Sequence, residues 1–481
     1  MGCGYSTNNV SDEAYSAGTA TVTSPATSPT GVVITTTNER VPDATTSTSI
    51  PISSEPGEEV PPTVSVTIPS YTGASSDESV TAIVVHFNPS NYARRAVLVN
   101  ECIQRLVETQ LRLSDPPNTD PSGPPPMSKV GLDITVVELC YGSNEPQIDP
   151  NNYPTVKTIC CRCDSKHKMW SKEQLVNIAL DDQYLSPEAK YVAWIDSDIA
   201  FTDDSWVTDV ATSLSKHEFA FGQIWSTCEM LGPEENSYEP KVMVSSFSAQ
   251  HAAGKSYTAR NNADREYWHP GFAWMATVSA VRATQGLIAQ TLGSADRHMA
   301  MSFLGSVIET VPDGLSEGYL DQVLTWQEYV KEHKIQLVHV PCHIQHFWHG
   351  PMQQRKYMER FDILKKHQFD PRIHLRLHYS GLYLWTESCP QELIQDVATY
   401  FNERQEDSTR TCDDAGVAIR PDNGKGWINS MMDDGAANVP TEAGGLDAAA
   451  AAAAFAHTQA TSNGNSTCDA SSPSDPLNIY A

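Results

Sequence analysis

Long apolar runs, a regular cysteine framework and an excess of basic residues are all missing from this sequence of 481 residues. No stretch is apolar and long enough to be the core of a signal peptide or a transmembrane helix, so we expect a cytoplasmic protein. Eleven cysteines are an odd number without regular spacing, which argues for a reducing compartment rather than a disulfide scaffold. Acidic residues outnumber basic ones by 59 to 32, so nucleic acid is not an expected partner.

The cysteines form a single local cluster, at Cys160, Cys161 and Cys163. A structural zinc site usually needs a second pair of ligands at a defined spacing, and the sequence offers none nearby. We therefore do not expect these three residues to form a zinc site.

Both ends of the chain differ in composition from the middle. Residues 1–78 are dominated by Ser, Thr, Pro and Val, and residues 405–481 are polar and acidic with an alanine run at 448–454. Segments of this kind bury too little apolar surface to fold, so we expect both to be disordered. Residues 79–404 hold nearly all the Trp and Phe, and we expect them to form one folded domain.

The first six residues, Met-Gly-Cys-Gly-Tyr-Ser, match the pattern for N-myristoylation at Gly2, with Ser6 at the required distance. Cys3 is placed to accept a palmitoyl group as well. Two acyl chains would anchor the chain to a membrane, whereas one gives only marginal binding. The alternative is a chance match on a flexible tail.

Strands and helices alternate in the middle of the chain. Apolar, β-branched runs predict strands at 80–87, 132–139, 156–160, 191–195, 219–225 and 336–340. Helical periodicity predicts helices at about 99–107, 171–182, 204–216, 280–291, 295–304, 316–332 and 353–367, and the second of these is expected to begin with a capping box of Ser171 and Gln174. Residues 226–267 are expected to be irregular. The alternation predicts an α/β fold with a largely parallel sheet, in which ligands lie beyond the carboxyl ends of the strands.

Two aspartates stand where the strand at 191–195 ends. Asp196 and Asp198 are separated by one residue and followed by apolar residues, so they do not belong to a general acidic run. Carboxylates at this position can share one Mg²⁺ or Mn²⁺, although an isolated pair of this kind is also typical of a polar turn that caps the next helix.

Three histidines within seven residues, at 343, 346 and 349, follow the last predicted strand. Imidazole is a common ligand of transition metals and could complete a shell that the aspartates begin. The alternative is a packed, hydrogen-bonded corner of the core.

Four short motifs occur in order, and together they resemble a known family. They are Trp-Ile-Asp-Ser-Asp-Ile at 194–199, His-Pro-Gly-Phe-Ala-Trp at 269–274, Gly-Ser-Ala-Asp-Arg-His-Met-Ala at 293–300 and His-Phe-Trp-His-Gly at 346–350. With these motifs, residues 80–369 resemble the nucleotide-sugar glycosyltransferases of the GT-A fold, in particular a branch found in bacteria and large viruses. The resemblance implies a Rossmann-like, largely parallel sheet flanked by helices. It also implies metal-dependent transfer of a sugar from a nucleoside-diphosphate sugar, with uridine preferred by analogy alone, to an acceptor.

The resemblance also gives roles to individual residues. Asp196 would face the donor ribose or the metal, Asp198 would ligate Mn²⁺ or Mg²⁺, and His346 would supply a further ligand, with His349 as the rival. Asp296 matches an acidic residue that meets the acceptor hydroxyl, either as general base or as an acceptor-positioning group. From the sequence alone, a charge in the first turn of a helix capped by Ser294 explains Asp296 as well. Contacts with the donor or acceptor are expected from Phe87, Asn88, Glu138, Lys172, Asn177, His269, Gly271 and Trp274.

Two functions of other classes remain open. A metallo-phosphohydrolase could use the same Asp and His residues, but it usually needs two ions and more ligands than the sequence offers. A non-catalytic, lipid-anchored protein with a GT-A-like fold would have no need of the intact Asp196, Asp198, Asp296 and His346.

Overall fold

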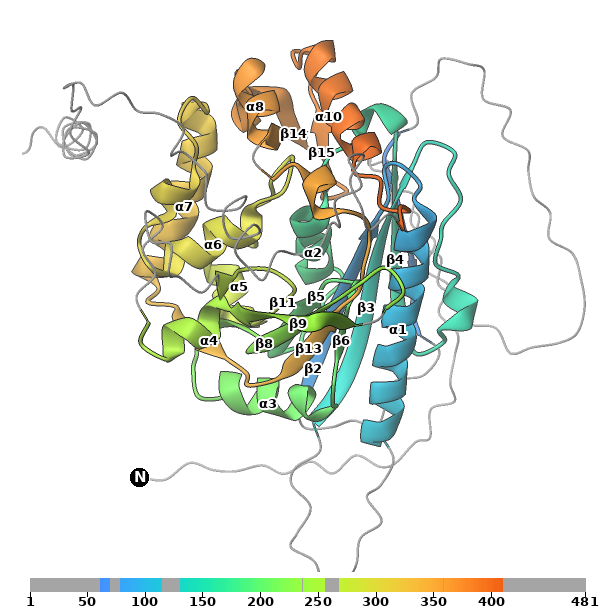
Figure 1. Cartoon of the computed structure of the whole chain (residues 1–481), viewed down its shortest axis with the longest axis vertical. Helices are drawn as coiled ribbons and strands as arrows, with labels where there is room; N and C mark the ends of the chain where they lie inside the picture. Colours follow the sequence, from blue (N-terminus) through green and yellow to red (C-terminus); the bar gives the residue numbers. More distant parts are fainter. Residues whose placement is uncertain are drawn as a thin grey trace, which may run out of the picture. The chain divides into compact units, whose positions relative to one another are not determined.

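The computed structural model describes residues 61–69, 78–114, 130–235, 237–255, 268–357 and 359–409. Two β-sheets form the centre of this region, and helices pack on both faces of the larger sheet (Figure 1). The predicted fold class is confirmed, because the chain folds as an α/β domain with a largely parallel sheet flanked by helices, as expected for the GT-A fold. None of the described helices combines the length and the apolar character needed to cross a membrane.

The larger sheet contains eight strands in the order β1-β4-β3-β2-β5-β11-β7-β12. Their bounds are Thr63–Thr67 (β1), Glu78–Phe87 (β2), Val130–Tyr141 (β3), Lys157–Cys163 (β4), Tyr191–Ile195 (β5), Ala220–Gln223 (β7), Ala273–Thr277 (β11) and Gln336–His339 (β12). Strands β4, β3, β2 and β5 are parallel neighbours, whereas β11 runs antiparallel to both β5 and β7. Because β5 is buried on both faces, its sequence is a continuous apolar run rather than an alternating one.

The second sheet has five strands in the order β10-β9-β8-β13-β6. Their bounds are Ile199–Phe201 (β6), Thr227–Leu231 (β8), Ser237–Ser246 (β9), Trp268–His269 (β10) and His343–His346 (β13). The prediction that 226–267 is irregular is therefore wrong for its first part, where β8, β9 and the helix α4 (Phe247–Ala252) form. Strand β8 is buried at every position after Thr227, so it lacks the alternation that marks a strand in sequence. Residues 256–267 lie outside the described residues.

Helices enclose the larger sheet from both sides. One core contains apolar side chains of α1 (Ala93–Ser114) and α3 (Ser205–Leu214), packed against β2, β3 and β5. The core of the other face is shared by α2 (Lys172–Leu180), α5 (Val278–Ala283), α6 (Ala295–Phe303), α7 (Glu317–Glu332), α8 (Glu359–Lys366) and α10 (Gln391–Glu403). Shorter elements are α9 (Pro371–His374), the hairpin of β14 (Leu375–Leu377) and β15 (Tyr383–Trp385), and the 3-10 turns η1 (Pro150–Asn152), η2 (Ser165–His167), η3 (Val307–Thr310) and η4 (Met352–Arg355).

The folded domain extends past both boundaries predicted from composition. Strand β1 lies within 1–78, for which disorder is predicted, yet it pairs with β4 and buries Val64. Alternation of Thr or Ser with Val over these residues suits an edge strand, but the Ser/Thr-rich surroundings conceal it. Beyond residue 404, Glu406 is 1% exposed and the Asp407 carboxylate accepts hydrogen bonds from the amides of Ala93 and Arg94 at the start of α1. The remainder of both predicted tails lies outside the described residues.

The starts and ends of three helices differ from the predictions. The capping box at α2 is wrong, because Ser171 Oγ donates to the Met169 carbonyl and Gln174 Oε1 accepts from the Tyr383 amide. Helix α5 ends at Ala283 instead of reaching 291, since Gly286 adopts a left-handed conformation with φ of 92°. The helix expected at 353–367 is divided between η4 and α8.

Candidate active site

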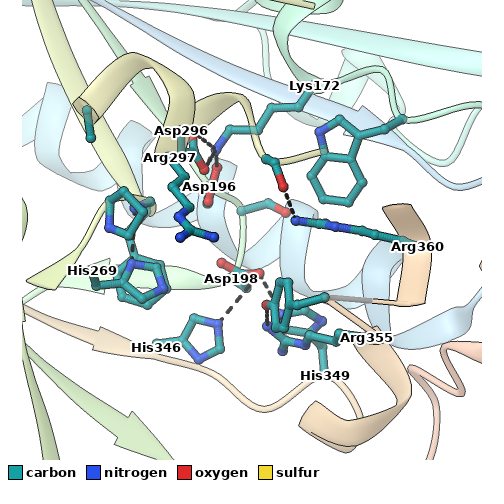
Figure 2. A pocket seen from close by; sticks show the side chains of 18 of the residues that line it. Lys172, Asp196, Asp198, His269, Asp296, Arg297, His346, His349, Arg355 and Arg360 are labelled. Atoms are coloured by element: carbon teal, nitrogen blue, oxygen red, sulfur yellow. Dashed lines mark hydrogen bonds and ion pairs between the residues drawn. The ribbon is translucent and has the colours of Figure 1, made fainter. Parts of the chain in front are cut away.

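The turn between β5 and β6 directs the two predicted aspartates toward different partners. Asp196 follows the last residue of β5, and its amide donates to the Phe272 carbonyl at 2.8 Å. Its carboxylate lies 2.7 Å from Lys172 Nζ, whereas the carboxylate of Asp198 lies beside His346 and His349. Figure 2 shows the two carboxylates facing these separate groups.

Asp198, His346 and His349 form a cluster with the composition of a metal site. One possible ligand atom from each residue lies within 4.8 Å of the others. Asp198 Oδ2 is 2.8 Å from His349 Nε2 and 3.8 Å from His346 Nε2. The pairing of β13 with β6 sets this geometry, because His346 is the register partner of Ile199.

The environment of this cluster fits a divalent cation. Asp198 Oδ1 and His346 Nε2 are both buried and have no hydrogen-bond partner among the described residues. Buried polar atoms are rarely left in this state, so a further ligand is expected there. Burial lowers the pKa of both His346 and His349, which favours the neutral imidazole that a metal requires.

The two histidines differ in the state of Nε2. Arg355 donates a hydrogen bond to Nε2 of His349 at 2.7 Å, so this nitrogen already has a partner. Nε2 of His346 has none in the described part of the chain. Of these two nitrogens, Nε2 of His346 is therefore the one that still needs a partner.

Lys172 joins the other two aspartates of the site. It begins α2, is 6% exposed, and places its ammonium 2.7 Å from Asp196 and 3.3 Å from Asp296. Burial disfavours the charged ammonium, but the carboxylates of Asp196 and Asp296 outweigh this effect and raise the pKa of Lys172 above its ordinary value. Asp196 is therefore held by a protein cation and is not a member of the Asp198 cluster.

Asp296 lies in the first turn of α6, as predicted. The predicted cap is wrong, because Ser294 adopts φ of 84° and makes no side-chain cap bond; its Oγ accepts a hydrogen bond from Arg360 instead. Gly271 lies close to the carboxylate of Asp296. A Cβ on Gly271 would come within 3.2 Å of Asp296 Oδ2 and 2.9 Å of His269, so only glycine fits this contact without a shift.

A cavity of about 200 Å³ brings most of the predicted residues together. Those that line it are Phe87, Lys172, Asp196, Asp198, His269, Gly271, Asp296, His346 and His349. The position of the cavity next to the carboxyl end of β5 agrees with the rule for ligands of α/β sheets.

Four predicted residues do not line the cavity but support its surroundings. The Asn88 amide bonds the Tyr92 backbone, and the Asn177 amide bonds both backbone groups of Leu287. Trp274 is fully buried, stacks on Trp194 and donates to a backbone carbonyl in the turn that carries Gly271. Glu138 is buried below the loop that follows β3.

Five arginines that were not predicted from the sequence line the same cavity, namely Arg95, Arg297, Arg355, Arg360 and Arg404. Arg95 and Arg404 are both paired with the buried Glu406. Arg355 and Arg360 are buried, form no ion pair with a carboxylate among the described residues, and each leaves Nε without a partner. Buried guanidinium groups in this state suit a phosphate or carboxylate ligand.

Neither a family model nor a curated protein matches the chain. Among solved structures, it is similar to Drosophila β1,4-galactosyltransferase 7 in complex with manganese, UDP-galactose and xylobiose, at 9% identity and a TM-score of 0.26. This match covers 55% of the chain and 64% of the galactosyltransferase, which is just under two thirds of its length. A protein assigned as a nucleotide-diphospho-sugar transferase from Desulfovibrio desulfuricans matches 57% of the chain at 8% identity, covers 84% of its own length and gives a TM-score of 0.24. Similarity at this level transfers neither an activity nor a ligand to the chain.

Proposed function

We propose that the chain is a metal-dependent glycosyltransferase that transfers a sugar from a nucleoside-diphosphate sugar to an acceptor. The observation that carries the proposal is the Asp198–His346–His349 cluster, with its partnerless Asp198 Oδ1 and His346 Nε2, in a cavity that also holds buried guanidinium groups. A diphosphate has the charge and the oxygen atoms to meet both features.

The ligand set favours Mn²⁺ over Mg²⁺. Mg²⁺ is bound mainly through oxygen ligands, whereas imidazole suits softer divalent ions. Of the two ions considered, Mn²⁺ is therefore the better match to two imidazoles and one carboxylate. When bound, the ion would act as a Lewis acid that stabilises negative charge on the departing diphosphate.

The residues of the chain supply the other parts of the reaction. Arg355 and Arg360 would hold the diphosphate, and Lys172 holds Asp196 and Asp296 in place. Asp296 would accept the proton of the acceptor hydroxyl. The hydroxyl oxygen of the acceptor would then bond to the anomeric carbon of the donor sugar, while the bond from that carbon to the phosphate oxygen breaks. Uridine diphosphate sugars are the preferred donors and guanosine diphosphate sugars the alternative.

The first test measures nucleotide binding. Calorimetric titration of UDP and GDP should show binding that depends on Mn²⁺ in the wild type and is lost in Asp198→Asn. Asp209→Asn, on α3 and outside the cavity, is the control and should bind as the wild type does. Failure of both diphosphates to bind with Mn²⁺ would contradict the proposal.

The second test distinguishes the alternatives. Incubation with nucleotide sugars should release the nucleoside diphosphate, and simple phosphoesters should not be cleaved. The phosphohydrolase is disfavoured because, among the described residues lining the cavity, one cluster with metal-ligand geometry is present and two ions would need more ligands. Metal-dependent binding without any turnover would instead indicate a non-catalytic protein.

The N-terminal prediction falls outside the described residues and remains a proposal. Gly2 would carry a myristoyl group, and Cys3 would strengthen membrane association of an otherwise cytoplasmic enzyme. Fractionation of Gly2→Ala against the wild type tests this, and an unchanged distribution would show that the pattern occurs by chance.

A further inference from the structure

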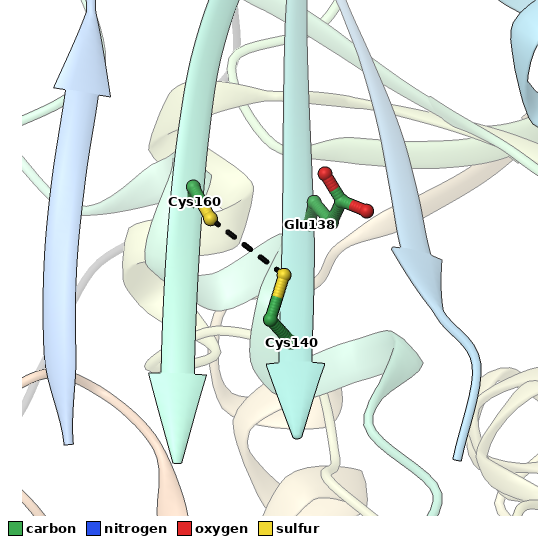
Figure 3. A group of neighbouring side chains, drawn as sticks. All are labelled: Glu138, Cys140 and Cys160. Carbon is green, nitrogen blue, oxygen red and sulfur yellow. Dashed lines mark hydrogen bonds between the residues drawn. The ribbon is translucent and has the colours of Figure 1, made fainter. Parts of the chain in front are cut away.

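A second group of possible ligands lies on the sheet, away from the cavity. Glu138 and Cys140 are two residues apart on β3, so their side chains point to the same face. On β4, Cys160 is the register partner of Glu138, and Arg162 is the register partner of Cys140. Figure 3 shows the carboxylate and the two thiols gathered across these neighbouring strands. Cys161 faces the opposite core, so the local Cys160–Cys163 cluster is divided between the two faces.

The spacing of the sulfur atoms matches that of two ligands of one tetrahedral ion. Sγ of Cys140 and Sγ of Cys160 are 3.8 Å apart. Two thiolates at about 2.3 Å from a tetrahedral zinc ion are separated by about 3.8 Å. A ligand atom of Glu138 also lies within 4.8 Å of both sulfurs. Because all three residues are fixed by the strand ladder, their positions are set before any ion binds.

Backbone amides hold the carboxylate in place. Glu138 is 2% exposed, and its two oxygens accept hydrogen bonds from the amides of Gln147 at 2.6 Å and Ile148 at 3.4 Å. Each oxygen keeps a lone pair, and such outer hydrogen bonds are what orients a carboxylate ligand in known metal sites. Without an ion, burial raises the pKa of Glu138, and the two amides only partly oppose this.

The charges of the group also suit a divalent ion. Two thiolates and one carboxylate carry three negative charges, and the ion together with the Arg162 guanidinium would supply three positive ones. Arg162 is held beside the group by hydrogen bonds to the carbonyls of Gly142 and Asn144.

We propose that Glu138, Cys140 and Cys160 bind one Zn²⁺ ion, with the fourth position open to water. Cys160 is half-buried beside the exposed Ser65 of β1, which gives the ion and the water a path from solvent. The ion would tie β3 to β4 and secure the carboxylate that holds the loop carrying Gln147. Gln147 in turn bonds Asn88 at the end of β2, so the ion would support the surroundings of the cavity from outside it.

Cadmium is a suitable probe, because its bond to a thiolate gives an ultraviolet charge-transfer band that histidine and carboxylate ligands do not give. Titration of the reduced full-length protein with Cd²⁺ should produce this band, saturating at one thiolate-bound ion per chain. Cys160→Ala should abolish it. Cys161→Ala, the neighbouring position on the opposite face, should retain it in full. The absence of a band in the wild type, or its survival in Cys160→Ala, would overturn the proposal.

Two further measurements control for variants that do not fold and for cadmium or zinc bound by other thiols of the chain. Near-ultraviolet circular dichroism establishes that each variant is folded, and Cys140→Ser serves as a second variant with a smaller change in volume. X-ray absorption of the zinc-loaded wild type should count two sulfur ligands at one ion. A spectrum without sulfur ligands, or a disulfide between Cys140 and Cys160 in the protein purified under reducing conditions, would also overturn the proposal.

Discussion

Glu406 offers a sharp test of how the C-terminal residues build the site. Its carboxylate is 1% exposed and lies between the guanidinium groups of Arg95 and Arg404, which both line the cavity. In Glu406→Gln the buried Arg404 and the partly buried Arg95 would both lose their counter-charge. Removing one partner of a buried ion pair costs about 3–5 kcal/mol of the free energy of unfolding.

This cost can be converted into a change of melting temperature. At about 2.1 cal/mol/K of unfolding entropy per residue, over the roughly 310 residues that the structure describes, it corresponds to a decrease of about 5–8 °C. Differential scanning calorimetry at pH 7 measures it directly. A melting temperature within about 1 °C of the wild type would refute the reasoning.

The pH dependence gives an independent check. Burial alone would raise the pKa of Glu406, but Arg95 and Arg404 outweigh it and hold the pKa well below its usual range. A depressed pKa in the folded state contributes stability above the unfolded pKa, near about 4.3, and this contribution is lost as the pH falls toward the folded value. The difference between wild type and Glu406→Gln should therefore be full at pH 7 and decrease below about pH 4.3.

Two truncated chains distinguish the contribution of residues 405–409 to stability from that of the residues after 409. A chain ending at residue 409 keeps the contacts of residues 405–408 with α1 and Trp348, whereas a chain ending at 404 loses them. The first should melt close to the wild type and the second at least as low as Glu406→Gln. Equal melting temperatures for the two truncated chains would contradict a structural role for this segment.

Three further predictions concern the cavity. Asp296→Asn should lower turnover at least about a hundredfold while donor affinity stays near wild type. Steady-state kinetics with donor titration tests this, and near-normal turnover would leave Asp296 as a charge on the helix. His346→Ala should weaken Mn²⁺-dependent nucleotide binding, measured by calorimetry, more than His349→Ala does, because Nε2 of His349 is already hydrogen-bonded. The reverse ranking would make His349 the main ligand. Gly271→Ala should reduce turnover, since its Cβ would come within 3.2 Å of Asp296 Oδ2; unchanged kinetics would show that the contact relaxes without effect.

Local sequence patterns predicted the parts of the site that depend on local structure. An apolar run ending in Asp196 and Asp198 is a buried strand followed by a turn, and the structure has both. The strand that ends at His346 was not predicted, but Asp296 lies in the first turn of a helix, as expected. Such positions follow from strand and helix periodicity within a few residues, which is the range over which sequence patterns are informative.

The arginines could not be found in this way, because their elements meet only in the folded chain. Arg95 lies on α1, Arg297 on α6, Arg355 in η4 and Arg360 on α8, while Arg404 directly follows α10. In sequence each has the appearance of an ordinary charge on a polar helix face. What distinguishes these arginines is that they line a cavity inside an acidic chain. Their position depends on tertiary structure, so it cannot be read from the local sequence. The same holds for Glu406, whose partner Arg95 is 311 residues away.

The charges around the cavity bear on what can enter it. Five arginines and one lysine line it together with three aspartates, so its lining carries a surplus of positive charge when the histidines are neutral. The whole chain, in contrast, has a net charge of −27, which repels anions at long range. Since salt screens such repulsion beyond about 8–10 Å, the field of the cavity prevails for an anion at its mouth. The hydroxyl groups of an uncharged ligand could accept hydrogen bonds from the partnerless Nε atoms of Arg355 and Arg360, but the charge-assisted bonds to a phosphate or carboxylate are stronger, so these two guanidinium groups favour an anionic ligand.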